Sequence, residues 1–166
     1  MSSTISLAVL EALKTELASQ MPVKVKGFGG GSVKWYFTDT YIDPGNCPAI
    51  CIIERGWTKT EETCRGGGLS QTTVGGMVWR RFTVEVMVWL KGGGTTDEVL
   101  RSQLQTWCDA VAAIMDASYQ LETTQLIASS RSGANLETMR GTGGWFGVGQ
   151  IRVDVDVFTQ QGAVAL

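Results

Sequence analysis

The sequence predicts an α+β domain, in which two helices pack on one face of a mainly antiparallel sheet with long Gly-rich loops. Three observations lead to this class. Residues 77–90 form a strand in which an apolar set alternates with a partly polar set from Arg81 onward, a helical apolar stripe covers residues 95–117, and the order along the chain is helix, several strands, helix, strands. With 166 residues, of which 43% are hydrophobic, the chain is long enough for one domain spanning 1–166.

The first helix is predicted over residues 4–20. Its apolar positions recur every three or four residues, at Leu7, Leu10, Leu13, Leu17 and Met21. We expect Pro22 to end this helix, because proline disfavours the helical conformation of the residue before it. Short strands are predicted over 23–25 and 33–38. Residues 48–54 are almost all apolar, which predicts a central strand covered on both faces.

Residues 77–90 give the clearest strand. The alternating set that we assign to the core is Phe82, Val84, Val86, Val88 and Leu90. The other set ends with Met87 and Trp89, so the second face of this strand is more apolar than an ordinary solvent-exposed face. The glycine-rich segments 56–76 and 132–149 predict loops, the first of them alternatively an extended hairpin.

The second helix is predicted to run from Thr95 to about residue 117. Its apolar stripe consists of Leu100, Leu104, Trp107, Cys108, Val111, Ile114 and Met115. Thr95 and Glu98 have the spacing of a capping box. A weaker strand is predicted over 125–130 and a closing strand over 151–159. The inward residues of the closing strand are Ile151, Val153, Val155 and Val157.

Composition excludes several classes of function. The net charge of −2 gives no electrostatic reason for specific nucleic-acid binding, and no apolar segment has the length of a membrane span or the form of a secretory signal. We therefore expect an intracellular protein without a membrane partner. The chain has no histidine, which removes the commonest general base and metal ligand, and its glycine clusters complete no phosphate-binding motif. No enzyme activity, catalytic residue, cofactor or metal is predicted.

Three acids allow one catalytic alternative. Asp154 and Asp156 share a face of the closing strand, and with Glu85 they could hold Mg²⁺ in a metal-dependent enzyme. We favour a charged outer face in which Arg81 and Arg152 are the partners of these acids, because no histidine or lysine motif accompanies them.

The tryptophans indicate a contact surface. Of the six, Trp57, Trp79 and Trp145 lie in or beside glycine-rich segments. They either fold as a lid over their own core or anchor a protein interface, where tryptophan and arginine are enriched. The residues that we predict for such an interface are Trp57, Arg80, Met87, Trp89, Trp145 and Phe146.

Over residues 5–159 the chain resembles the tail terminator and related tail-completion proteins of tailed bacteriophages. The likeness lies in the order of elements, the Pro48-Ala49-Ile50 entry to the central strand, the threonine and glutamate box at 95–98, and the closing strand Ile151-Arg152-Val153-Asp154-Val155. It implies a structural virion protein at the head–tail junction, assembled in the host cytoplasm. Its copies form a ring, commonly a hexamer, that caps the tail tube, stops tube polymerisation and joins the tail to the head connector.

The partners implied by this resemblance are further copies of the chain, the tail tube protein and the head–tail connector, while DNA passes through the ring. In that arrangement we expect Glu85, Asp154 and Asp156 to face the channel, where negative charge keeps DNA phosphate from binding. Two alternatives stay open: a head-completion or neck adaptor protein of a phage, and a non-viral soluble α+β module that binds proteins.

Overall fold

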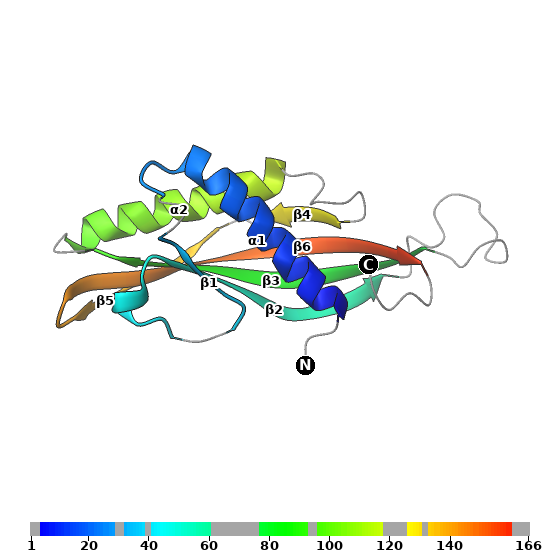
Figure 1. Ribbon diagram of the computed structural model, residues 1–166, viewed down its shortest axis with the longest axis horizontal. Coiled ribbons are helices and arrows are strands. Elements are labelled where there is room, and N and C mark those ends of the chain that lie inside the picture. The colour runs from blue at the N-terminus through cyan, green and yellow to red at the C-terminus, as the bar shows by residue number, and fades with distance from the viewer. Residues whose placement is uncertain are drawn as a thin grey trace.

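Both helices lie on the same face of a single sheet in the computed structural model (Figure 1). The structure describes residues 4–28, 32–38, 41–60, 77–92, 96–117, 126–130 and 133–160. The elements in chain order are α1 (Thr4–Lys24), β1 (Lys34–Tyr36), the short helix η1 (Pro44–Asn46), β2 (Ala49–Thr60), β3 (Met77–Lys91), α2 (Asp97–Ala117), β4 (Leu126–Ser130), β5 (Asn135–Gly141) and β6 (Gly144–Gln160). The predicted α+β class is confirmed.

The sheet has six strands in the order β1-β2-β3-β6-β4, and β5 also pairs with β6. All pairs are antiparallel except β1 with β2. β3 is central, because its partners are β2 on one side and β6 on the other. β4 and β5 lie along the same edge of β6, where Ser130 pairs with Val153 and Asn135 pairs with Gln150. β4 and β5 therefore pair with successive parts of the same edge of β6.

The main core fills the space between the helices and the sheet. The side chains predicted to face inward from the two longest strands are buried: Phe82, Val84, Val86, Val88, Leu90, Ile151, Val153, Val155 and Val157. The helices contribute the facing layer, with Leu13 and Leu17 from α1 and Leu104 and Val111 from α2 fully covered. Burial of each such side chain is worth about 1.5–3 kcal/mol, so this layer is the main source of stability.

Helix α2 buries the predicted apolar stripe and adds Ala110 to it. The helix begins at Asp97, and the Thr96 hydroxyl accepts a hydrogen bond from the Val99 amide at 3.4 Å. Thr96 therefore caps the first turn, a role that the sequence predicted for Thr95, which lies outside the described residues. A hydrogen bond from Thr138 on β5 lowers the pKa of Asp97, which ties the start of the helix to the hairpin.

Helix α1 begins at Thr4 as predicted but extends beyond its predicted end at residue 20. Pro22 does not end the helix, which continues to Lys24, and the amide of Val25 still donates to the Met21 carbonyl at 2.9 Å. Proline removes only its own backbone donor, so the following residues keep their bonds. The strand predicted over 23–25 is therefore wrong. Leu7, which its spacing predicts on the buried face of the helix, is instead 49% exposed. Val9, which is not part of the predicted stripe, is buried in the core.

The glycine-rich segment 132–149 is a hairpin, and the loop predicted there is wrong. β5 and β6 pair from Asn135 with Gln150 to Gly141 with Gly144. Gly147 and Gly149 are buried beneath α2, where a Cβ on Gly149 would collide with the Cys108 sulfur. These two glycines permit close approach of a helix to a strand, whereas the sequence predicted a loop around them. Of segment 56–76, residues up to Thr60 continue β2, and 61–76 lie outside the described residues.

None of the helices in the described part of the chain is long and apolar enough to cross a membrane.

Replacing Gly147 by alanine should destabilise the fold by about 1–3 kcal/mol. The new methyl group would lie 2.5 Å from the Glu137 carbonyl oxygen and 2.9 Å from Leu104 Cδ1, so backbone or helix must move. Urea unfolding measures the effect. Gly143→Ala is the matched control, since its methyl group would meet only the end of Lys91, at 3.7 Å. Equal stability of the two variants would contradict the close-approach role.

Alkaline pH should weaken the fold through Cys108. Burial raises the pKa of this thiol from its ordinary value of 9.0 to about 12. The folded state therefore holds the proton more tightly than the unfolded state, and stability falls as the pH rises above about 9. Between pH 8 and pH 10 the wild type should lose about 1.4 kcal/mol more than Cys108→Ala, measured by urea unfolding at each pH. An equal loss in both proteins would argue against this linkage.

Candidate protein-interaction surface

A β-bulge in β2 divides the surface of the sheet. The pairing between β2 and β3 shifts between Glu54 and Gly56, and Gly56 has a positive φ of 134°. Before the bulge, Ile52 pairs with Val86 on the helix side. After it, Trp57 pairs with Phe82 and so also lies on the helix side. The extra residue thereby places the Trp57 ring on the face that carries the helices.

The face opposite the helices, which we call the outer face, carries ion pairs on β3 and β6. Its residues there are Arg81, Thr83, Glu85, Arg152, Asp154 and Asp156, and they pair directly across the two strands. The register therefore brings the three acids of the sequence prediction onto one face. Direct cross-strand neighbours lie within contact distance, which allows each acid a partner of opposite charge or a hydroxyl.

Arginine or a hydroxyl group engages each acid of the outer face. Arg81 donates to both carboxylate oxygens of Asp156, at 2.7 and 3.1 Å, and this hydrogen bond raises the pKa of Arg81. The Thr83 hydroxyl donates to Asp154 at 3.4 Å. The predicted pairing of Arg81 with one of the acids is confirmed. Glu85 stands opposite Arg152 in the register, but its ion pair at 2.7 Å is with Arg55, a residue that the sequence analysis did not single out.

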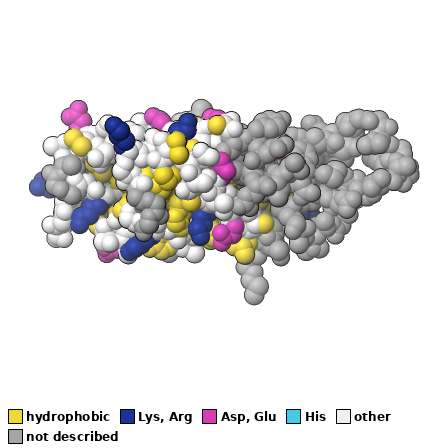
Figure 2. All heavy atoms as spheres, turned by 45° about the horizontal axis from the view of Figure 1, so that its top comes forward, with side chains coloured by type: hydrophobic (Ala, Val, Ile, Leu, Met, Phe, Trp, Pro, Cys, Tyr) yellow, Lys and Arg dark blue, Asp and Glu magenta, His cyan; other side chains and the backbone are white. Residues whose placement is uncertain are grey.

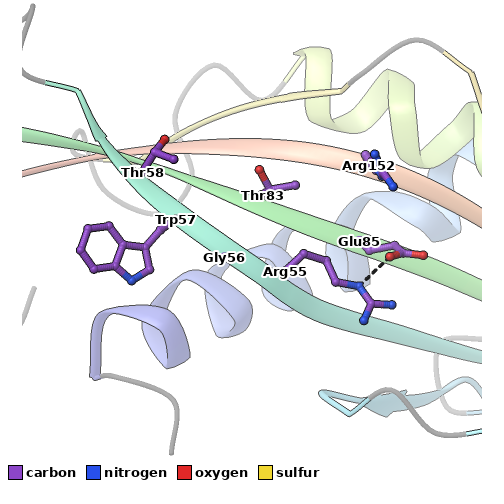
Figure 3. Close-up of a pocket in the computed structure, with 7 residues that line it drawn as sticks. All are labelled: Arg55, Gly56, Trp57, Thr58, Thr83, Glu85 and Arg152. Carbon is purple, nitrogen blue, oxygen red and sulfur yellow. Dashed lines mark hydrogen bonds and ion pairs between the residues drawn. The ribbon is translucent and has the colours of Figure 1, made fainter.

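An open groove of about 580 Å³ lies at the bulge on this face (Figure 3). The residues that line it are Arg55, Gly56, Trp57, Thr58, Thr83, Glu85 and Arg152. Figure 3 shows Arg55 bonded to Glu85, with the Trp57 ring apart from them. The groove offers guanidinium and hydroxyl groups for hydrogen bonding. Among the described residues, no group of three or more His, Cys, Asp or Glu is placed to hold a metal ion.

Two of the predicted interface residues, Trp57 and Arg80, are in contact. The Arg80 guanidinium carbon lies 5.0 Å from the centroid of the Trp57 ring, within the range of a cation–π interaction. The same ring lies 6.3 Å from the ring of Phe82 at the margin of the main core. Trp57 nevertheless stays 49% exposed. Neighbouring strands thus present a guanidinium and an indole together at the surface.

Three other predicted interface residues are inside the chain. Met87, Trp89 and Phe146 belong to a second apolar cluster on the outer face, together with Ile42, Ala49, Cys51, Ile53 and Val148. Their exposed fractions are 4%, 6% and 7%, so their side chains contact their own chain in this structure. The segment around η1 covers them. There Asp43 accepts a hydrogen bond from the Gly45 amide at 2.8 Å and fixes the turn.

Tyr41 is an exposed aromatic residue that the sequence analysis missed. Its ring meets Trp89 edge to face at 5.6 Å and Phe146 at 6.1 Å, while 62% of the residue is exposed. Trp145, also predicted for the interface, is half-buried against the main core. A lone tyrosine in a polar segment carries no periodic signal, so its position depends on the tertiary fold.

No protein-family model matches this chain, and no curated protein matches its sequence.

The pair of Arg55 and Glu85 should show measurable coupling. Both residues lie at the bulge, and the side chain of Glu85 is only 12% exposed. A double-mutant cycle with Arg55→Ala and Glu85→Gln should give a coupling free energy of about 0.5–1 kcal/mol in urea unfolding, reduced in high salt. Strictly additive effects would show that the pair adds nothing to stability.

Proposed function

We propose that this protein is a structural component of a tailed-bacteriophage head–tail junction, most specifically the tail terminator. The observation that carries the proposal is the order of elements in one sheet. An N-terminal helix precedes the central strands β2 and β3, a capped amphipathic helix follows them on the same face, and β6 closes the sheet. This is the order by which the sequence resembles tail-terminator proteins.

The proposed mechanism is assembly without chemical transformation of a substrate. Copies of the chain form a ring, commonly a hexamer, on the last disc of the tail tube, which prevents further tube subunits from adding. The opposite side of the ring contacts the head–tail connector. A ring requires a heterologous contact between two different patches of each copy. The two ends of the long sheet carry different exposed residues, which supports such a contact, with Trp57 of β2 at one end and Met139 of β5 at the other.

The proposed channel lining has a mixed charge. Glu85, Asp154 and Asp156 share the outer face with Arg55, Arg81 and Arg152. If this face lines the channel, attraction of DNA phosphate by the arginines offsets repulsion by the acids, and little net charge remains. In this proposal DNA passes because no single-sign surface holds it.

Addition of the purified protein to growing tail tubes should shorten them and leave a ring at one end. Tube length and end structure are measured by electron microscopy, and the mass of the protein alone is measured by light scattering. Tubes that grow to the same length with unchanged ends would contradict a terminator. Binding to isolated connectors without any effect on tubes would instead support the neck adaptor.

A further inference from the structure

Arg80 and Arg81 are neighbours in the sequence with opposite surroundings. Arg81 lies on the outer face, where Asp156 binds it through two hydrogen bonds. Arg80 lies on the helix side, and its Nε is buried without a hydrogen-bond acceptor. No ion pair of Arg80 is found within the part of the chain that the structure describes. Arg81 therefore has an acid partner within the chain, whereas the described residues provide none for Arg80.

The contact with Trp57 does not neutralise Arg80. A cation–π contact orients the guanidinium but does not neutralise its positive charge, and it accepts no hydrogen bond from the buried Nε. A carboxylate could accept hydrogen bonds from the planar guanidinium while an apolar group covers the exposed half of the indole. Tryptophan and arginine together in this way are the residues that most often dominate a protein interface. The pair therefore fits a partner group that combines negative charge with apolar surface.

The other end of the molecule offers that combination. Glu98, at the start of α2, is exposed and precedes Val99, which is 44% exposed. Glu137 on β5 is exposed two residues before Met139, which is 36% exposed. Within the described residues, neither glutamate has an ion pair. Across the sheet, Glu137 is in register with Val148 and Val148 with Trp89. Trp89 is nine residues from Arg80 along β3, so Glu137 lies about 30 Å from Arg80 along the strand direction.

We propose that the Trp57–Arg80 pair receives the Glu98 and Glu137 end of a second copy of this chain. The inference rests on the proposed ring, and it names the subunit contact that the ring would use. Charge complementarity favours this occupant. Within the described residues, one patch has a guanidinium without an ion pair beside an exposed indole, and the other has carboxylates without ion pairs beside exposed apolar side chains. Because the two patches lie at opposite ends of the sheet (Figure 1), the contact is head to tail and repeats from copy to copy.

Nucleic acid is a poorer occupant of this site. The chain has a net charge of −2, and on the face that Figure 2 shows, the Lys and Arg side chains of the described residues are scattered among Asp and Glu. A phosphate backbone needs several such cations along its length. A single carboxylate needs one guanidinium, which is what Arg80 supplies.

The test compares the two arginines in the full-length protein. Arg80→Glu should weaken ring formation by about 100-fold or more in concentration, because it places like charges opposite each other. Arg81→Ala, which removes an ion pair on the other face, should leave ring formation within about threefold of the wild type. Ring mass is measured by light scattering across a dilution series, alone and with tail tubes. Circular dichroism and urea unfolding check that both variants fold.

A charge reversal identifies the partner residue. Arg80→Glu combined with Glu98→Lys or with Glu137→Lys should restore the ring in at least one of the two double variants. Unchanged ring formation by Arg80→Glu, or loss that neither reversal restores, would overturn this inference while the wild-type ring still supports the proposed function. A wild-type protein that stays a monomer even on tail tubes would overturn both.

Discussion

The close packing of α2 on β6 is the constraint on which the rest of this fold depends. Gly147 and Gly149 lack side chains where Leu104 and Cys108 of the helix descend onto the strand. The helix can therefore lie directly on the sheet, and its apolar stripe meets the inward residues of the central strands. With larger residues at these glycines the helix would stand off, and a cavity or a displaced hairpin would cost several kcal/mol.

The helices cover one face of the sheet. The outer face has an apolar part and a part that carries ion pairs. Towards the β5–β6 hairpin, the segment around η1 closes an apolar cluster that contains Trp89 and Phe146. Towards the far end, arginines and acids pair across β2, β3 and β6. The bulge at Gly56 lies in the polar part and moves Trp57 to the helix side. The single extra residue in β2 thus determines that the exposed Trp57 side chain lies on the helix side of the sheet.

The proposed function requires surfaces that fit other subunits, and it involves no chemical reaction. Among the described residues, Arg80 Nε is buried without a hydrogen-bond acceptor, and this costs an isolated chain free energy even though the cation–π contact with Trp57 is favourable. The same pair is favourable when a partner supplies the missing acceptor. The neighbouring Arg81 shows the alternative, in which the chain itself provides the acid. In the proposed assembly, Arg81 contributes to the stability of the chain itself, whereas Arg80 contributes to the contact between copies.

The sequence by itself determined the class of fold, the two helices and the inward residues of the long strands. Val84, Val86, Val153 and Val155 follow a period of two that depends only on local backbone geometry, so neighbouring residues suffice to place them. Only the tertiary structure decided that Gly147 and Gly149 serve close packing, that Trp89 is covered and that none of the described acids pairs with Arg80. These properties depend on the distance between elements far apart in the chain, and no local pattern of residues encodes that distance.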